Sequence, residues 1–561
     1  MSELTNSSTV LLLLNNSLMI KMNRDIIKDQ LIKISLTPTR IIVLVSMWMV
    51  LIQNEAFFRS LLIDYPMGMD QVGFLICVSI FLMAFIALEF TLLAAVVPVR
   101  VAASIVLVVS ASTSYFMSEY STIFDRVMIR NLMETNVSEA QDLIGWSLVQ
   151  WILLTAVLPI LAIWNIPWRA SSYGKSLKTY GLTLVASLLI MIACVVPYSS
   201  KFTSFAREHK PIHYVANPIY PVYSMVRFIQ EILPSANDQP FQKISSSPQT
   251  PDWDKDYDLV VIVVGETART DHFSLNGYRR ETNPLLQARN NIISYSNVSS
   301  CGTSTAISVP CMFSYQTKDE FNVESAINEE NVLDTLSKAG VDVLWRDNNS
   351  SSKNVADRVT YENFRTPELN PVCDEECRDV GMLSGLQEYL DGERGDKLIV
   401  LHQMGSHGPA YYLRYPEEFE RFSPACKTKE LSECSQEELI NAYDNTILYT
   451  DYFLDQVIDL LENNRHHYEA SMIYIGDHGE SLGENGVYLH GLPYMLAPKS
   501  QTSVPMIVWG GTTTDLNMQG TEALKDLPHS HDGLTNALLE LFEIETDTYL
   551  KIPHPMIAVS H

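Results

Sequence analysis

Carboxylate and imidazole side chains follow two apolar runs of the kind that form buried strands. Val260–Gly265 leads directly into Glu266, and Ile473–Gly476 leads into Asp477 and His478. Two carboxylates and one imidazole are ordinary ligands of zinc, and oxygen ligands beside a single nitrogen suit a site that processes phosphate. These three residues are therefore candidate metal ligands.

A third apolar run, Leu398–Leu401, leads into His402 and then into Gly405–Gly408, which contains His407. Any one of these polar residues, taken alone, is typical of an ordinary loop end. The carboxyl ends of parallel strands meet at one edge of a sheet, however, so three such strand ends predict a shared site.

A nucleophile or a fourth ligand is expected from the loop that starts at Cys301. A disulfide between Cys301 and Cys311 would hold this loop in shape, and the loop contains Thr303, Ser304 and Thr305. A hydroxyl beside zinc loses its proton more readily, as water does, and can then attack phosphorus to give a covalent intermediate. Spacing alone leaves open which of the three hydroxyls acts.

Short apolar runs alternate with helical segments from residue 256 onward. The predicted strands are Leu259–Val264, Ile292–Val298, Val341–Trp345, Leu398–His402, Met472–Ile475 and Pro505–Trp509. Several are continuously apolar, as strands buried on both faces should be. Segments 437–463 and 533–542 are the expected covering helices. Residues 251–561 are thus predicted to form an α/β domain with its site at the strand carboxyl ends.

Five apolar stretches in the N-terminal part are candidates for membrane spans. They cover residues 41–58, 72–97, 101–118, 143–165 and 180–197. Buried helices of a soluble protein are the alternative, but five such stretches within 160 residues favour a bilayer, whose apolar core is about 30 Å thick. Residues 40–198 are therefore predicted to be a five-helix transmembrane domain, and the proline-rich residues 199–250 to be a bridge.

Basic residues predict the orientation of these spans. They gather in the N-terminal extension, residues 1–39, and in the second and fourth connections, whereas the first and third connections are acidic. Lys and Arg are retained on the cytoplasmic side, so the extension is predicted to be cytoplasmic and residues 251–561 to lie outside the cytoplasm.

Six of the eight cysteines form close pairs in polar sequence. The pairs are Cys301/Cys311, Cys373/Cys377 and Cys426/Cys434. Disulfides and zinc knuckles both use close pairs, but the chain has no CxxC and few histidines near the pairs, which favours three local disulfides. Disulfides form in oxidising compartments. The cysteines therefore predict the same side of the membrane as the basic residues.

The charge of the chain excludes one class of partner. Residues 1–200 hold 12 Lys and Arg against 12 Asp and Glu, so the net charge of −26 belongs to the remainder. Nucleic-acid binding depends on Lys and Arg that neutralise phosphates, so we expect no nucleic-acid partner. We expect the chain to act as a monomer in the bilayer.

The connection between the third and fourth apolar stretches is polar, and residues 124–140 are predicted to be helical. Asn131, Thr135 and Glu139 are spaced to share one helical face. A solvated face is the ordinary interpretation of that pattern, and a row that holds a lipid headgroup at the outer membrane surface is the alternative.

Four motifs, in order, resemble those of the lipid A phosphoethanolamine transferases, a family that includes the mobile colistin-resistance enzymes and belongs to the alkaline phosphatase/sulfatase superfamily. They are Gly265–Arg269, the segment Ser300–Thr305 with Ser308–Ser314, Gly405–Pro409 and Gly476–Glu484. The resemblance covers about residues 40–555. The presence of four motifs in the family's order makes a chance match very unlikely.

The resemblance implies a role for each matching residue. Zinc would be bound by Glu266, Thr305, Asp477 and His478, with Thr305 as the nucleophile and a second, weaker zinc site possible at His407 and His490. Donor contacts would come from Asn131, Thr135, Glu139, Asn349, Lys353, His407 and His490, with Lys353, His407 and His490 also assisting catalysis. The three cysteine pairs match the family's disulfides in spacing.

The resemblance also implies the activity: transfer of phosphoethanolamine from phosphatidylethanolamine to a lipid A phosphate in the periplasm of a bacterium, giving resistance to cationic peptides such as polymyxin. The core sugars, Kdo and periplasmic glycans are alternative acceptors. A sulfatase would need Cys or Ser followed by x-Pro-x-Arg, which neither Cys301 nor Cys311 has. Glycerophosphate polymerases match less well around residues 300–314, and a non-catalytic membrane scaffold or sensor would not need all four ligand residues.

Overall fold

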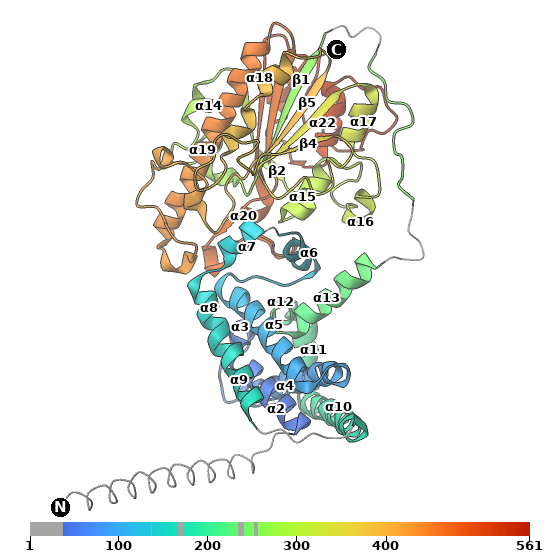
Figure 1. Ribbon diagram of the computed structural model, residues 1–561, viewed down its shortest axis with the longest axis vertical. Helices are drawn as coiled ribbons and strands as arrows, with labels where there is room; N and C mark the ends of the chain where they lie inside the picture. The colour runs from blue at the N-terminus through green and yellow to red at the C-terminus, as the bar shows by residue number, and fades with distance from the viewer. Residues whose placement is uncertain (1–36, 136, 167–172, 234–239, 252–255, 561) are drawn as a thin grey trace, which may run out of the picture. The chain divides into compact units, whose positions relative to one another are not determined.

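The computed structural model describes residues 37–135, 137–166, 173–233, 240–251 and 256–560. It forms two compact units (Figure 1). The first comprises Met1–Glu119 with Trp146–Ser224, and the second comprises Tyr120–Gly145 with Met225–His561. The predicted extension, residues 1–39, falls almost wholly outside the described residues. Residues 120–145, which the sequence places between two apolar stretches, belong to the second unit.

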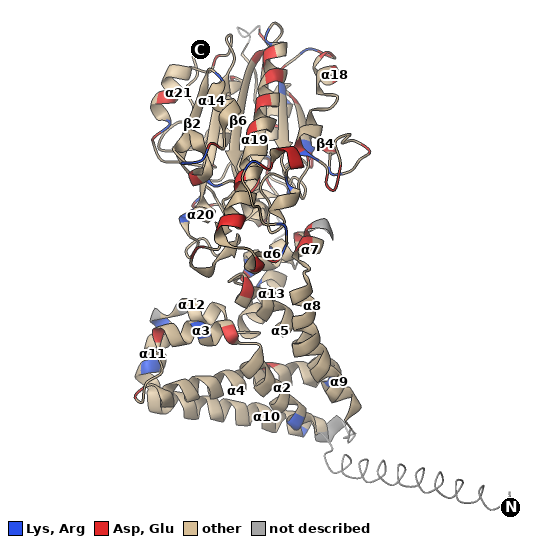
Figure 2. Ribbon diagram, turned by 90° about the vertical axis from the view of Figure 1, so that its left-hand side faces the viewer, with Lys and Arg blue, Asp and Glu red and all other residues tan. Residues whose placement is uncertain are grey.

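Four helical segments of the first unit are long and apolar enough to cross a membrane. They are α4 (Val72–Val96), α5 (Val99–Glu119), the segment Trp146–Asn165 and the segment Ser176–Arg207, most of which is α10 (Tyr173–Val195). The described parts of these spans carry few charged residues (Figure 2). The fifth predicted span is a pair of helices, α2 (Pro38–Ile52) and α3 (Glu55–Asp64), bent by 58°. Within the described residues, four helical segments are thus long and apolar enough to span a membrane, or five if the bent pair is one span.

A buried polar cluster explains where the bent pair breaks. The side chain of Asn217 donates to the carbonyl oxygens of Gln53 and Ser110, at 2.9 and 2.8 Å. Asn54 donates to the carbonyl oxygen of Asn217 at 2.8 Å, and Thr113 donates to the Asn217 side chain at 2.7 Å. Backbone groups released at a helix break need such partners, because the apolar core of a bilayer offers no water.

The second unit is built on one eight-stranded sheet in the order β10-β2-β9-β6-β1-β5-β3-β4. The six predicted strands are all present as β1 (Asp258–Gly265), β2 (Ile292–Ser299), β3 (Asp342–Asp347), β5 (Lys397–His402), β6 (Glu469–Gly476) and β9 (Ser503–Gly510). The sequence missed β4 (Thr360–Asn363) and β10 (His529–Ser530), which are short edge strands. All pairings in this sheet are parallel except those of β9 with β2 and β6.

Helices cover both faces of this sheet (Figure 1). One face packs against α17 (Val332–Ala339) and α22 (Gly533–Leu541), and the other is covered by α14 (Pro284–Ala288) and α19 (Gln436–Asn464). Every residue of β1 is buried, which is why its sequence is continuously apolar after Asp258. The α/β fold and the two covering helices predicted from sequence are therefore confirmed.

The segment 120–145 forms two short helices where the sequence predicted one. The first is α6 (Arg126–Glu134) and the second is α7 (Val137–Leu143). At Thr135 the backbone leaves the helical region, with ψ of 127°, and the Thr135 hydroxyl donates to the carbonyl oxygen of Asn131 at 2.7 Å. Threonine disfavours helix interiors because its side chain is branched and its hydroxyl competes for backbone groups. Asn131, Thr135 and Glu139 consequently do not line one continuous helix.

Buried charges fasten this segment within the second unit. Asp142, 7% exposed, accepts from Arg414 at 2.6 Å and from Lys429 at 2.8 Å. The side chain of Arg414 is 1% exposed, and it also contacts Glu376 and donates to the carbonyl oxygen of His407 at 2.7 Å. Burial alone would raise the pKa of Asp142, but Arg414 and Lys429 lower it below its ordinary value. Arg414 therefore links the inserted segment to the loop of His407.

We predict that Asp142→Asn lowers the free energy of unfolding by on the order of 3 kcal/mol, because it leaves the buried Arg414 with one carboxylate instead of two. The measurement is urea unfolding of the full chain in detergent micelles, followed by tryptophan fluorescence. Glu55→Gln is the control, since it breaks the Arg59–Glu55 pair, whose two side chains are 57% exposed, and should cost less than about 1 kcal/mol. Equal costs for the two variants would contradict the prediction.

Candidate active site

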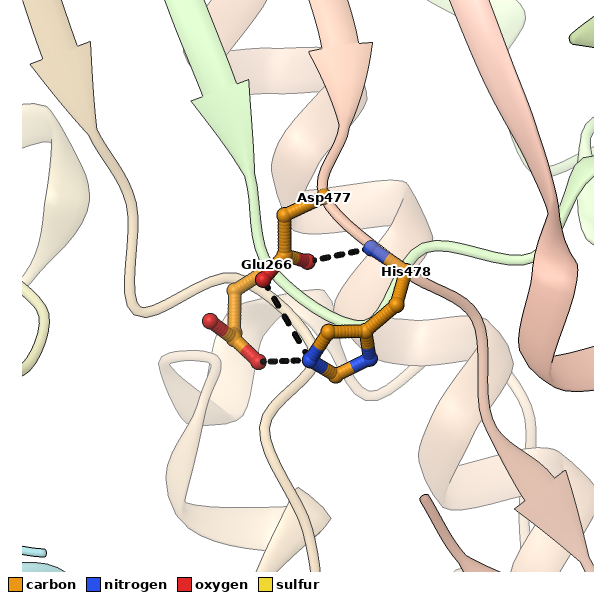
Figure 3. A group of neighbouring side chains, drawn as sticks. All are labelled: Glu266, Asp477 and His478. Atoms are coloured by element: carbon orange, nitrogen blue, oxygen red, sulfur yellow. Dashed lines mark hydrogen bonds and ion pairs between the residues drawn. The ribbon is translucent and has the colours of Figure 1, made fainter. Parts of the chain in front are cut away.

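The candidate ligands lie at the carboxyl ends of two neighbouring strands. In the parallel pair β1 and β6, Gly265 lies opposite Gly476, so Glu266 and Asp477 leave the sheet side by side. Figure 3 shows Glu266, Asp477 and His478 pointing toward one another. Their exposed fractions are 1%, 0% and 0%. Of the polar residues expected to meet at the strand ends, Glu266, Asp477 and His478 therefore do lie together.

Each carboxylate has one satisfied oxygen and one that has no hydrogen-bond partner among the described residues. Asp477 Oδ1 accepts from the backbone N–H groups of Thr267 and His478, at 3.0 and 2.7 Å. Glu266 Oε2 accepts from Asn349 Nδ2 at 2.7 Å. The remaining oxygens, Glu266 Oε1 and Asp477 Oδ2, are buried without a donor and lie 3.5 and 3.3 Å from His478 Nε2.

The tautomer of His478 follows from its second nitrogen. Nδ1 lies 3.0 Å from the carbonyl oxygen of Gly479, which can only accept, so Nδ1 carries the proton and Nε2 presents its lone pair. Burial, with the nearby His490 ring, lowers the pKa of His478 to about 4. Burial also raises the pKa values of Glu266 and Asp477, the first with help from the Asp477 charge. Once the carboxylates have lost their protons, three electron-pair donors face one another, and such a group can hold a metal ion.

Thr305 is the hydroxyl that reaches this group. It is the first residue of α15 (Thr305–Met312), and its Oγ1 donates to Glu266 Oε2 at 3.1 Å and lies 3.4 Å from His478 Nε2. The Thr303 hydroxyl instead donates to the carbonyl oxygen of Leu492 at 2.7 Å. Among the three hydroxyls that spacing left open, the geometry therefore favours Thr305.

The antiparallel strand β9 starts at this edge of the sheet and supports both loops. The N–H of Ser300 donates to the carbonyl oxygen of Thr502 at 2.9 Å. The N–H of Gly479 donates to the carbonyl oxygen of Gln501 at 3.0 Å. The two residues that precede β9 thus hold the loop of Thr305 and the loop of His478.

Two further histidines predicted from sequence lie beside His478. The ring of His490 is centred 4.2 Å from that of His478, and the ring of His407 is centred 5.7 Å from that of His490. His490 Nδ1 lies 2.8 Å from Glu480 Oε2, and Tyr411 donates to Glu480 Oε1 at 2.5 Å. Burial lowers the pKa of His407 well below its ordinary value and that of His490 to about 4, so both rings are neutral near pH 7.

The predicted donor-binding residues Lys353 and Asn131 lie where α6 meets two loops of this unit. Lys353, whose side chain is 8% exposed, lies 3.7 Å from Glu134 of α6 and lines a cavity of about 540 Å³ with Glu134 and Tyr361. On the other side, a Cβ on Gly491 would lie 3.8 Å from Asn131 Nδ2, so α6 also approaches the loop of His490. Glu139 lies in the first turn of α7.

Some supporting residues were not predicted. Asp379 is buried and accepts from the N–H groups of Met404 and Gly405, at 2.9 and 3.1 Å, which shapes the loop leading to His407. Gly405 has φ of +51°, and a Cβ there would lie 2.9 Å from the Glu266 carbonyl oxygen. Nothing local in the sequence marks Asp379. Glu480 was recognisable, since it follows His478 by two residues within the quoted motif.

The three predicted disulfides are present in this unit. They join Cys301 to Cys311, Cys373 to Cys377 and Cys426 to Cys434. The first closes the segment that carries Thr305, and the second lies in the loop whose Glu376 contacts Arg414. Cys77 and Cys194, in the apolar helices, are free.

Comparison with known proteins places this architecture in one family. Residues 258–544 match the sulfatase family model, and residues 82–233 match the model of phosphoethanolamine transferase EptA/EptB. The chain is 41% identical to phosphatidylethanolamine transferase Mcr-1 of Escherichia coli, over 91% of this chain and 96% of that protein. It is 37% identical to phosphoethanolamine transferase EptA of Salmonella typhimurium, over 91% and 94%.

A solved structure of an integral membrane protein has the same fold. It is lipooligosaccharide phosphoethanolamine transferase A of Neisseria meningitidis, with a TM-score of 0.85, 33% identity, and coverage of 91% of this chain and 96% of that one. The family resemblance seen in the motifs is thereby confirmed. The chain has apolar spans, a disulfide-bonded periplasmic α/β domain of the sulfatase fold, and these relatives. It therefore belongs to the phosphoethanolamine transferase family.

Proposed function

We propose that this chain transfers phosphoethanolamine from phosphatidylethanolamine to a phosphate of lipid A, through an intermediate carried on Thr305. One observation carries the proposal: the Thr305 hydroxyl at the start of α15 contacts the buried Glu266 carboxylate and the neutral His478 imidazole, and the buried carboxylate of Asp477 lies 3.3 Å from the same imidazole. The relatives are named for a phosphatidylethanolamine donor and a lipooligosaccharide acceptor, which supports this choice of substrates.

The residues at this site fit zinc. Glu266 Oε1 and Asp477 Oδ2 are buried acceptors with no donor among the described residues. His478 Nε2 lies 3.5 and 3.3 Å from them, and Thr305 Oγ1 lies beside it at 3.4 Å. A cation offsets the repulsion among these groups, and the two-carboxylate, one-imidazole set is an ordinary zinc set. Bound zinc supplies positive charge that makes a neighbouring hydroxyl more acidic and draws phosphoryl oxygens toward it. A second zinc at His407 and His490 stays a prediction.

In the first step, Thr305 Oγ1 forms a bond to phosphorus while the bond from phosphorus to the diacylglycerol oxygen breaks. The Thr305 hydroxyl donates to Glu266 Oε2, and this carboxylate accepts the proton as Oγ1 attacks. Lys353 would face the oxygens of the transferring group and stabilise their charge, since the contacts of its Nζ with described residues are long: Glu134 Oε2 at 3.7 Å and the Ser350 carbonyl oxygen at 3.4 Å.

The departing diacylglycerol oxygen needs a proton, and His490 can present one. Burial raises the pKa of Glu480 to about 8 and lowers that of His490 to about 4, so near pH 7 the proton between them lies on the carboxyl group. His490 Nδ1 then accepts from Glu480, and its own hydrogen lies on Nε2, the atom that is free of this contact. His407, also neutral, is the alternative proton donor.

In the second step, a phosphate oxygen of the acceptor attacks phosphorus and the bond to Thr305 Oγ1 breaks. Oγ1 then takes back the proton from Glu266 Oε2, which regenerates the hydroxyl. Lipid A phosphates are the proposed acceptors, and sugars of the core, Kdo and periplasmic glycans are the alternatives. The product gains an ammonium group, which offsets negative charge and weakens attraction for cationic peptides such as polymyxin.

We predict that Thr305→Ala abolishes the covalent phosphoethanolamine adduct and lowers transfer by on the order of 10³-fold or more, because the attacking oxygen is lost. Mass spectrometry of proteolysed protein, after incubation with phosphatidylethanolamine, detects the adduct. Thr305→Ser keeps an oxygen at this position and is the matched control. An adduct in Thr305→Ala on Thr303, Ser304 or any other residue would reject the assignment.

The acceptor is tested in cells. Expression of the parent chain in a Gram-negative host should add phosphoethanolamine to lipid A phosphate and raise polymyxin resistance, and expression of Thr305→Ala should do neither. Mass spectrometry of extracted lipid A, core sugars and periplasmic glycans gives the readout. Modification confined to the core or the glycans would reject lipid A as acceptor while leaving the transfer chemistry in place.

Zinc affinity should fall as the pH decreases, because the raised pKa values of Glu266 and Asp477 make protons compete with the metal. We expect at least a tenfold loss between pH 8 and pH 6 in a chelator competition titration. After zinc removal, the same pKa shifts determine whether stability rises or falls with pH. The folded state holds protons that unfolded carboxyls, with pKa values near 4, release, so the zinc-free chain should become less stable as the pH rises above that value.

The control for this experiment is Glu266→Gln with Asp477→Asn, which has no carboxylate to titrate at the site. Its thermal stability should depend less on pH than that of the zinc-free parent, and it should bind zinc weakly at every pH. A zinc-free parent that gains stability from pH 6 to pH 8, relative to this control, would contradict the prediction.

A further inference from the structure

We propose that His531 is a positioning residue that fixes the loop of Thr305 against the strand end that carries Asp477 and His478. The inference rests on the proposed function insofar as it concerns Thr305 as nucleophile and a metal at Asp477 and His478. It assigns a role to a histidine that has no part in the chemistry described above.

The sheet places His531 between the two segments. It follows β10, which pairs with β2 in parallel so that Ser530 lies opposite Ser299. β2 then continues into Ser300 and Cys301, the start of the nucleophile loop. The His531 side chain is fully buried, with an exposed fraction of 0%.

Each ring nitrogen of His531 contacts one of the two segments. Nδ1 lies 3.2 Å from the backbone nitrogen of Cys301, and Nε2 lies 2.8 Å from the carbonyl oxygen of Gly476. The N–H of Cys301 can only donate and the carbonyl of Gly476 can only accept, so the ring must be neutral with its proton on Nε2. Burial lowers the pKa of His531 to about 3, which keeps the ring in this form at any pH at which the protein works.

The two backbone partners are directly connected to the reacting groups. Cys301 is joined by disulfide to Cys311 at the far end of α15, so its position constrains Thr305 from both sides. Gly476 immediately precedes Asp477 and lies opposite Gly265, which precedes Glu266. One imidazole ring therefore spans the distance between the nucleophile loop and the ligand strand, and such supports must hold reacting groups to within about 0.5 Å.

His529, two residues earlier in β10, provides a comparison within the same segment. It is also buried, but its Nε2 lies 2.9 Å from the carbonyl oxygen of Leu524, and its ring packs edge-on against Tyr295. A buried histidine that serves packing alone should behave like His529. One that positions the site should affect zinc binding or phosphoryl transfer beyond its effect on stability.

Two substitutions separate the two contacts of His531. In His531→Asn, the amide oxygen can replace Nδ1 as acceptor for Cys301 while the donor to Gly476 is lost. In His531→Gln, the longer amide can replace Nε2 as donor to Gly476 while the acceptor for Cys301 is lost. His529→Gln is the matched control. Each variant is the full chain in lipid nanodiscs, and zinc affinity, the rate of adduct formation on Thr305 and thermal stability are measured.

We expect His531→Asn to lower zinc affinity by about 10- to 100-fold, the usual cost of losing a group that orients a metal ligand. We expect His531→Gln to keep zinc affinity within about threefold of the parent and to slow adduct formation at saturating zinc by about 10- to 100-fold. His529→Gln should change neither quantity, whatever it does to stability.

The proposal is overturned if both His531 variants keep the parent's zinc affinity and adduct rate, or if they lose both only in proportion to the folded fraction. A parent chain that binds zinc but forms no adduct on Thr305 would overturn the proposed function instead. In that case, unchanged zinc affinity in His531→Asn would still overturn the link between His531 and the ligand strand, and a selective loss would still support it.

Discussion

Two buried carboxylates held side by side are the constraint on which the rest of this unit depends. Glu266 and Asp477 are placed together by the register of β1 and β6, and each presents an oxygen that no described donor contacts. Buried charges of like sign are costly unless a cation or protons offset them. His478 keeps its proton on Nδ1, so its Nε2 lone pair faces the two carboxylates. The amide of Asn349 and the N–H groups around Asp477 orient those carboxylates, so that their free oxygens and Nε2 can share one positive ion. The rings of His478, His407 and His490 are neutral near pH 7 and add no positive charge beside these carboxylates.

The sequence contained enough to locate these atoms because the signals are local. A buried strand is an apolar run, and the residue that follows it reaches the sheet edge, so Glu266, Asp477 and His478 could be named without coordinates. The same reasoning located six strands of the main sheet, and the cysteine spacing predicted the three disulfides. The choice of Thr305 over Thr303 and Ser304 needed the family resemblance, because all three lie in one loop and only the start of α15 distinguishes them.

What the sequence did not predict depends on contacts between distant residues. Asp379 supports the backbone near His407 from a segment with no pattern of its own, and Arg414 meets Asp142 across 272 positions of the chain. The break at Thr135 was missed because spacing of four residues predicts a helical face without testing whether the helix continues. The short strands β4 and β10 have too few residues for alternation to show, yet β10 determines where His531 lies.

The reversed direction of β9 has a consequence for how the protein folds. In this sheet a parallel strand would bring its last residues to the catalytic edge, but β9 brings its first, so Gln501 and Thr502 meet both loops before the strand itself begins. The strand also joins β2 to β6, and these carry the two halves of the site. If β9 is not paired, neither β2 nor β6 is held to the other by this strand. A folding intermediate that lacks β9 therefore has no assembled active site. Catalytic competence should therefore appear late and cooperatively, after the most sequence-distant pairings of the sheet have closed.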